Sequence, residues 1–316
     1  MSEKPPRNRP SPNQPVQDPS GPNPPEPDES VVPELYTGER AATEKHRPLE
    51  SDAEADDRRK LERGPSQKPH PEAQPIVQVE GVHLAFDEPI LEDVSFQANE
   101  GETVVVVGES GTGKSTILKL LLRLLVPDKG RVLIDGENIV DLSFDEALEV
   151  RQKMGMVFQS AALFDSLTVF ENVAYPLREH TDLKEDEIEA RVREKLEFVD
   201  LEPEKVMTQM PAELSGGMRK RVGVARGMAN NAKIMLYDEP TSGLDPLTTA
   251  TITHLIMKLQ KELNVTSIVV SHDIRSSFRM GTKVALLAER RIVYFGTPEE
   301  MRKQDDEYIR KFLGGY

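Results

Sequence analysis

Short runs of β-branched and aliphatic residues recur along the chain from residue 76 onward. The runs 103–107, 233–237 and 267–270 are apolar almost throughout and are bounded by polar residues. Such runs are typical of strands that are buried on both faces of a parallel sheet. The intervening stretches carry apolar residues at helical spacing, as in Ile252, Leu255, Ile256 and Leu259. This alternation predicts an α/β fold.

Two further layers are expected beside that sheet. Residues 76–79 and 82–86, with a break at Gly81, and residues 90–96 have the composition of strands and predict an antiparallel β layer. From residue 160 the pattern turns helical and charged, with Val192 and Leu196 spaced for one helix face. This predicts a helical subdomain at about residues 160–225, inserted into the α/β core.

Composition divides the chain near residue 75. Residues 1–75 hold 16 of the 24 prolines and few aromatic residues. Such a segment cannot bury enough apolar surface to offset its chain entropy, so we expect a disordered, Pro-rich acidic tail. It has no apolar segment of the kind found in signal peptides. Residues 76–316 suffice for one α/β domain with a full core.

The composition of the whole chain excludes several classes of protein. No apolar run approaches the roughly 18 residues needed to span a bilayer, so attachment to a membrane would go through partners. The chain has no Cys, which excludes disulfides and thiolate chemistry. The net charge of −15 argues against a nucleic-acid-binding surface.

One nine-residue stretch carries the clearest chemistry. It fits the pattern G-x-x-x-x-G-K-[S/T] and consists of Gly108, Glu109, Ser110, Gly111, Thr112, Gly113, Lys114, Ser115 and Thr116. A predicted strand precedes it and a predicted helix, 117–125, follows it, which is the context in which backbone N–H groups wrap a phosphate. Lys114 would reach the β- and γ-phosphates, and the Ser115 hydroxyl would ligate Mg²⁺. The sequence therefore predicts a nucleotide-binding loop.

Polar residues follow three other predicted strands. Asp238 and Glu239 come directly after the run 233–237, at the strand end where ligands collect in α/β sheets. One carboxylate can hold Mg²⁺ while the other faces the attacking water as general base. His272 is similarly placed and could hydrogen-bond a γ-phosphate or the catalytic water. Gln159 could reach Mg²⁺ or water.

Two other features each allow two interpretations, and a third has only a structural one. Phe86 is either a core aromatic or a flat surface for an adenine ring. Ser215, Gly216 and Gly217 open a predicted helix, which is either an ordinary helix start or a second anion site. A second anion site would indicate a nucleotide shared between two copies. The basic run 219–221 is expected to lie on a solvated helix face.

In this order the segments resemble the motifs of an ABC transporter ATPase domain. The likeness covers about residues 76–313 and joins Walker A at 108–116, the Q-loop at Gln159, the signature at 214–217, Walker B at Asp238 and Glu239, the D-loop at 242–245 and the switch histidine at His272. It implies a P-loop NTPase core in which two copies pair head to tail. Each ATP would lie between the Walker A loop of one copy and the signature of the other.

The resemblance also implies roles for single residues. Glu239 would be the catalytic base, with His272 sensing the γ-phosphate and Lys114 and Gln159 assisting. The implied Mg²⁺ ligands are Ser115, Gln159 and Asp238. Phe86 would stack on adenine, and Asp245 of the D-loop would contribute to the shared nucleotide site.

A finer resemblance lies in residues 158–164 and 169–181, which look like the ATPase of Mla/MCE-type phospholipid transporters. It implies an integral membrane permease, a periplasmic MCE-domain protein and, in some systems, a small STAS-type protein as partners. The chain would then act at the cytoplasmic face of a bacterial inner membrane. The alternative is an ABC ATPase serving a permease for another substrate, such as amino acids, ions or drugs. An ABC protein acting on ribosomes or DNA would carry two ATPase domains or long coiled-coil insertions, and neither is present.

Overall fold

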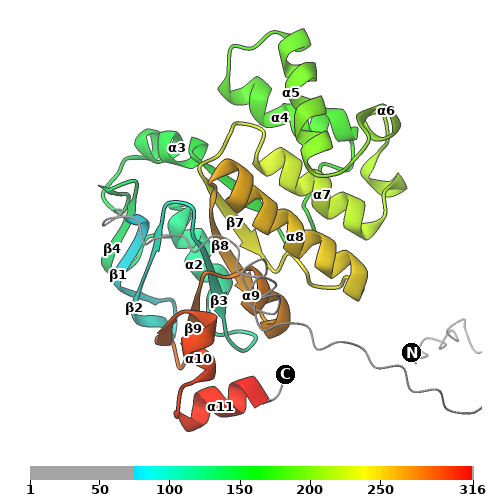
Figure 1. Ribbon diagram of the computed structural model, residues 1–316. Coiled ribbons are helices and arrows are strands. Elements are labelled where there is room, and N and C mark those ends of the chain that lie inside the picture. Colours follow the sequence, from blue (N-terminus) through cyan, green and yellow to red (C-terminus); the bar gives the residue numbers. More distant parts are fainter. Residues whose placement is uncertain (1–74, 315–316) are drawn as a thin grey trace, which may run out of the picture. The chain divides into compact units, whose positions relative to one another are not determined.

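The computed structural model describes residues 75–314. The predicted tail, 1–75, lies outside the described residues except for Pro75, which begins the first strand. The strands form two sheets (Figure 1). Their bounds are β1 (Pro75–Ala85), β2 (Pro89–Asn99), β3 (Thr103–Val107), β4 (Lys129–Ile134), β5 (Glu137–Asn138), β6 (Met154–Val157), β7 (Ile234–Asp238), β8 (Thr266–Ser271), β9 (Lys283–Ala288) and β10 (Arg291–Gly296).

The larger sheet has the strand order β10-β9-β3-β8-β7-β6, and the strands from β9 to β6 run parallel. Its central strand, β3, is buried at every position. Val105 and Val107 belong to the core on one face of the sheet, and Val104 and Val106 belong to the core on the other. The β-branched runs are therefore continuous because both faces are covered. The prediction of a buried parallel sheet is confirmed.

The smaller sheet has the order β2-β1-β4-β5 and is antiparallel, as predicted. β1 continues through Gly81 with a change of register, where the sequence indicated a break. Asp135 and Gly136 connect β4 to β5 with φ values of 53° and 80°, which suits a tight two-residue hairpin turn. Helix α2 shares the hydrophobic core of this sheet, and Figure 1 shows the helix next to it.

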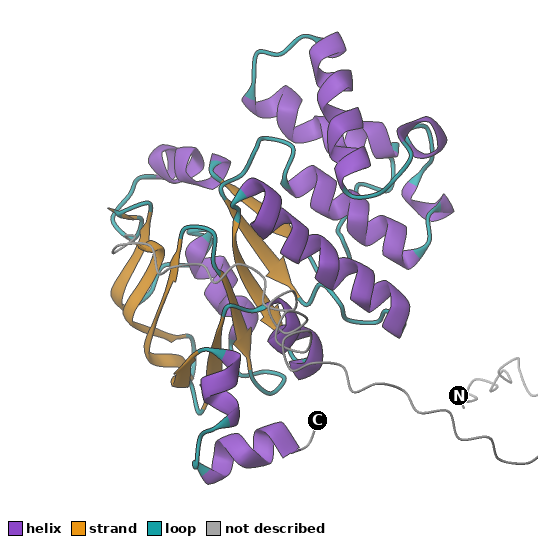
Figure 2. Cartoon of the chain, in the orientation of Figure 1, coloured by secondary structure: helices purple, strands orange, loops and turns teal. Residues whose placement is uncertain are grey.

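Helices cover the other face of the parallel sheet and build the predicted helical subdomain (Figure 2). The helical segments are α2 (Lys114–Leu121), α3 (Phe144–Gln152), α4 (Val169–His180), α5 (Glu185–Phe198), α6 (Pro203–Val206), the 3₁₀ turn η1 (Pro211–Glu213), α7 (Gly216–Gly227), α8 (Pro246–Leu263), α9 (Ile274–Met280), α10 (Pro298–Arg302) and α11 (Glu307–Gly314). The apolar face predicted for α8 is buried against this sheet. Among residues 75–314, no helix is long and apolar enough to cross a membrane.

Helix α2 is shorter than the predicted stretch 117–125, because it ends at Leu121. Arg123 adopts a φ of 53°, which stops the helical path. The Arg151 side chain supplies the missing partners, since Nε donates to Leu122 O at 2.8 Å and Nη2 donates to Arg123 O at 3.2 Å. A helix end needs partners for its last carbonyl groups, and here they come from a distant helix.

Asn172 holds the loop that leads from β6 into the helical subdomain. Its side chain is fully buried; Oδ1 accepts from Phe164 N at 2.8 Å. Nδ2 lies within 3.1 Å of three carbonyl oxygens, those of Phe164, Leu167 and Thr168. A loop outside the strands and helices needs partners for its backbone groups, and the Asn172 side chain makes four such hydrogen bonds.

We expect Asn172→Ala to lower the free energy of unfolding by about 2 to 4 kcal/mol, because it removes four hydrogen bonds made by a fully buried side chain. Urea denaturation followed by circular dichroism would measure the change. Asn99→Ala is the control, since the Asn99 side chain donates only to Glu102, and its effect should stay below about 1 kcal/mol. Equal losses in the two variants would contradict this account of Asn172.

Candidate functional site

The glycine loop lies between β3 and α2, at the carboxyl edge of the parallel sheet. Gly111 and Gly113 have φ values of 82° and 99°, which L side chains rarely adopt. A Cβ on Gly108 would lie 2.3 Å from the Leu287 carbonyl oxygen, so the first position also requires glycine. The backbone itself therefore accounts for the three glycines of this loop, the two that the pattern fixes and Gly111 between them.

Lys114 points back into this loop. Its Nζ donates to Gly108 O at 2.9 Å and to Glu109 O at 2.7 Å, and the residue is buried. Burial lowers the pKa of the Lys114 ammonium, while the negative charges of Glu239 and Asp238 act in the opposite direction. The ammonium is thus held at the centre of the loop and faces the two carboxylates.

The predicted metal ligands Ser115 and Asp238 come together from distant segments. Ser115 Oγ donates to Asp238 Oδ1 at 2.8 Å, at the junction of α2 and the end of β7. Residues 75–314 contain no group of three or more His, Cys, Asp or Glu side chains that could hold a metal by themselves. One hydroxyl and one carboxylate fit Mg²⁺, which usually takes one or two protein oxygens and completes its shell with water and substrate phosphates.

Glu239 and His272 also meet. His272 Nδ1 lies 2.7 Å from Glu239 Oε2, and the His272 backbone N–H donates to the same oxygen at 3.3 Å. Glu239 has a φ of 50°, which is uncommon for a non-glycine residue and is often found at functional sites. Its side chain is 14% exposed, so it can still be reached by water. The pair could orient a water molecule and accept its proton.

Gln159 lies just beyond β6, as the sequence predicted. Its Nε2 donates to Ser242 Oγ at 3.2 Å, and the Ser242 N–H donates to Glu239 O at 3.2 Å. The structure therefore brings Gln159 to the same sheet edge as Glu239. Whether it ligates Mg²⁺ or contacts water stays a prediction.

The expectation that residues 219–221 form a solvated face is wrong for Lys220, which is buried. Its Nζ donates to Gln159 O at 2.5 Å and lies 3.4 Å from Glu239 O. Burial lowers the pKa of the Lys220 ammonium, and the charges of Glu239 and Asp238 oppose that shift. The sequence held one usable signal, the small and apolar residues 222–225, which indicate a helix buried on most sides.

The signature turn and the D-loop are adjacent in the chain's own fold. Ser215 caps α7, because its Oγ accepts from Met218 N at 3.2 Å. A Cβ on Gly217 would lie 2.5 Å from Thr248 Cγ2, so glycine lets α7 approach the start of α8. Asp245 Oδ1 accepts from the Leu247 and Thr248 amides, which makes it the α8 cap. Nucleotide contacts by Ser215, Gly216, Gly217 and Asp245 stay predictions.

Phe86 follows β1 and is 64% exposed, which excludes the core interpretation. A large aromatic ring in water at the rim of a phosphate loop domain is available for stacking. Its contact with adenine stays a prediction.

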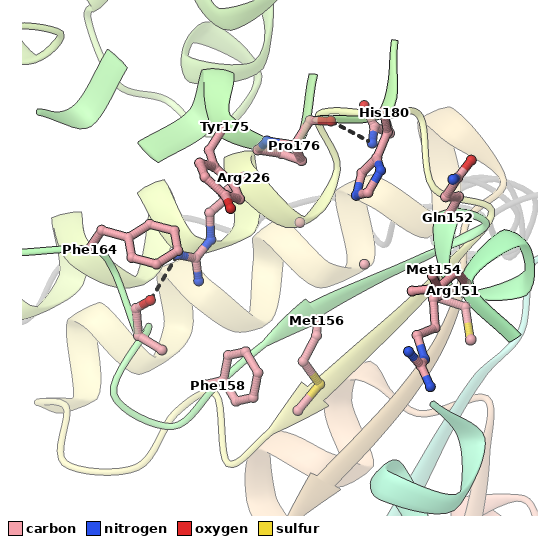
Figure 3. A pocket seen from close by; sticks show the side chains of 15 residues that line it. Arg151, Gln152, Met154, Met156, Phe158, Phe164, Tyr175, Pro176, His180 and Arg226 are labelled. Atoms are coloured by element: carbon pink, nitrogen blue, oxygen red, sulfur yellow. Dashed lines mark hydrogen bonds between the residues drawn. The ribbon is translucent and has the colours of Figure 1, made fainter. Parts of the chain in front are cut away.

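A groove of about 420 Å³ lies between β6, α3 and the helical subdomain (Figure 3). Its exposed aromatic residues are Phe158, Phe164 and Tyr175. The Phe164 and Tyr175 rings are 5.1 Å apart, and the Arg226 guanidinium lies 5.7 Å from the Phe164 ring centre. Arg226 also donates to Ala161 O and Ala162 O, which fixes the wall on which these rings sit. Exposed aromatics gathered in a groove indicate a binding surface.

Comparison with known proteins places these features in a family. The ABC transporter family profile matches residues 91–242. The MlaF protein of Haemophilus influenzae, named an intermembrane phospholipid transport system ATP-binding protein, is 41% identical over 75% of this chain and 90% of its own length. The chain belongs to the ABC transporter ATP-binding family. It is an ATPase of that family.

Other relatives and solved structures agree. The Mycobacterium leprae protein Mkl, named a probable ribonucleotide transport ATP-binding protein, is 41% identical over 76% of this chain and 69% of its own length. A dimeric ATP-binding cassette in a post-hydrolysis state with ADP and phosphate has a TM-score of 0.64 and 35% identity, covering 70% of this chain and 98% of that one. CbiO1 of Clostridium perfringens, part of an ABC transporter complex, has a TM-score of 0.67 and 32% identity over 75% and 94% of the two chains.

Proposed function

We propose that the chain is the ATP-hydrolysing motor subunit of a transporter that moves phospholipid across or between bacterial membranes. The observation that carries this proposal is the likeness to MlaF over 90% of that relative's length, together with an exposed aromatic groove on the helical side. The chain would bind peripherally at the cytoplasmic face of the inner membrane.

The geometry of the sheet edge supports a division of labour among the site residues. Lys114 and the loop 108–116 would bind the triphosphate. Ser115 and Asp238, whose oxygens are 2.8 Å apart, would hold Mg²⁺, with Gln159 nearby. Mg²⁺ would supply charge neutralisation for phosphoryl transfer. Glu239 would accept the proton of the attacking water, and His272, 2.7 Å from it, would orient the carboxylate and sense the γ-phosphate.

A second copy of the chain would complete each nucleotide site. Gly216 and Gly217 lie beside Leu244 and Thr248, at the start of α8. Ser215, at the amino end of α7, is exposed and lies beside the chain's own D-loop. This helix end would bind the phosphates of the nucleotide held by the partner copy. A solved relative with 35% identity is dimeric with ADP and phosphate bound, which supports this arrangement.

The groove would receive a cytoplasmic segment of the permease. Its three aromatic residues are each more than two-fifths exposed, and none belongs to either hydrophobic core of the described residues; they are Phe158, Phe164 and Tyr175. In the lipid-transport system the permease would be accompanied by a periplasmic MCE-domain protein and, in some systems, by a STAS-type protein.

Ribonucleotide transport is the second candidate, because Mkl has the same 41% identity. The match to Mkl spans 69% of that protein, against 90% for MlaF, and we therefore favour lipid. The cargo that co-purifies with the assembled transporter would distinguish the two.

Lys114→Ala should abolish ATP binding, because it removes the ammonium at the centre of the loop. Equilibrium binding of a fluorescent ATP analogue would test this, with Lys119→Ala as control, since Lys119 is exposed on the same helix. Unchanged nucleotide affinity in Lys114→Ala would refute the role given to this residue.

Glu239→Gln should bind ATP normally but turn it over at least about 100-fold more slowly, because the general base is lost. ATP should then hold two copies together, and light scattering with and without ATP would detect the dimer. Lys114→Ala should stay monomeric under the same conditions. Turnover within a few-fold of the parent would remove Glu239 as the base.

The transporter assignment is tested by purifying the tagged chain from detergent-solubilised membranes. We expect a permease and an MCE-domain protein to co-purify, with phospholipid in the complex. Tyr175→Glu should release them by placing a charge in the groove, while Tyr308→Glu, an exposed aromatic on α11, should not. Co-purification of a different permease with bound nucleotide would support the alternative.

A further inference from the structure

Four residues close a ring of hydrogen bonds behind the carboxylates. Lys220 Nζ donates to Gln159 O at 2.5 Å and, at 3.4 Å, to Glu239 O. Gln159 Nε2 donates to Ser242 Oγ at 3.2 Å, and the Ser242 N–H donates to Glu239 O at 3.2 Å, which closes the ring. The ring joins the end of β6, helix α7 and the turn after β7.

Each side of the ring has a different neighbour. Phe158, which lines the groove, immediately precedes Gln159. Helix α7 carries Lys220, which lies five residues after the helix cap Ser215, or about 1.4 helical turns further on. Glu239, whose carbonyl oxygen accepts from both Lys220 and Ser242, has a left-handed backbone conformation with a φ of 50°. A backbone held in that region persists only when its surroundings fix it.

We propose that Lys220 is a positioning residue that ties the Glu239 turn to Gln159, so that the groove, helix α7 and the catalytic carboxylate keep one geometry. The inference rests on the proposed roles of Glu239 and of the groove. The Lys220 ammonium donates to the backbone oxygens of Gln159 and Glu239, so it would act through them and not on the nucleotide.

A purely structural role is the competing explanation, and a second buried lysine allows the comparison. Lys195 on α5 is 4% exposed, against 5% for Lys220. Its Nζ donates to Glu194 at 2.8 Å and to Asn231 at 2.9 Å. Both lysines lie in the helical subdomain, but only Lys220 reaches the segments that carry the carboxylates. Substituting each by Met removes a buried ammonium of the same kind.

The test measures kcat, KM and the ATP dissociation constant of the full chain for Lys220→Met and Lys195→Met. We expect kcat to fall about 10-fold or more in Lys220→Met, with KM and ATP affinity within about twofold, because the base loses its position and the phosphate loop does not. Lys195→Met should keep kcat within about twofold. Lys220→Arg, which keeps a cation and its donors, should recover most of the lost kcat.

Three outcomes would overturn the proposal: an unchanged kcat in Lys220→Met, a parallel loss of ATP affinity, or an equal loss in Lys195→Met. If Lys220→Met does not fold, Ser242→Ala decides, because it opens the ring at the exposed Gln159–Ser242 hydrogen bond. A kcat about threefold lower at unchanged affinity would support the ring, and an unchanged kcat would reject it. Normal turnover by Glu239→Gln would instead reject the proposed function itself, whatever Lys220 does.

Discussion

Two buried ammonium groups face the two carboxylates at the end of β7, and the site depends on this balance of charge. Lys114 and Lys220 come from different helices, and each is held by backbone carbonyl oxygens. Burial disfavours both cations, whereas Asp238 and Glu239 favour them. A buried charge without a partner is strongly unfavourable, so lysines and carboxylates require one another. The arrangement places positive charge where phosphates would bind. The two ammonium groups also offset the repulsion between the neighbouring carboxylates of Asp238 and Glu239.

The parallel sheet explains why these groups meet at one edge. Its central strands β3 and β8 are buried at every position, which disfavours charged side chains within them, so the charged groups lie at and beyond the carboxyl ends of the strands. Phe158 and Gln159 follow the same strand, β6, yet one lines the groove and the other contributes to the hydrogen-bonded ring. A displacement of Phe158 in the groove wall would therefore also shift Gln159, the next residue, whose carbonyl oxygen is bonded to Lys220. The proposed partner surface and the proposed hydrolytic site are thus connected through two residues that are adjacent in the chain, Phe158 and Gln159.

The sequence predicts those parts of the structure that local residues decide. The loop 108–116 needs glycines for its own backbone, and the buried strands are apolar on both faces, so both are visible without a fold. Contacts between distant segments are not. The carboxyl end of α2 is set by Arg151, about thirty residues later in the chain. Lys220 looked like part of a solvated basic run, because its partner Gln159 is 61 residues away. Phe86 could not be assigned to core or surface until its neighbours were known.

The nucleotide site and the aromatic groove are different parts of the molecule, and this difference bears on what is transported. In the proposed function, the residues around Ser115, Asp238 and Glu239 serve nucleotide chemistry, which does not depend on the cargo. Relatives with equal identity can therefore be named for phospholipid and for ribonucleotide transport without contradiction at this site. Any difference has to act through surfaces that contact other proteins, and the aromatic groove of Phe158, Phe164 and Tyr175 is the exposed surface that touches the ring. In the proposed transporter the partner proteins would therefore select the cargo, and the ATPase would supply hydrolysis at the carboxylates and a binding surface at the groove.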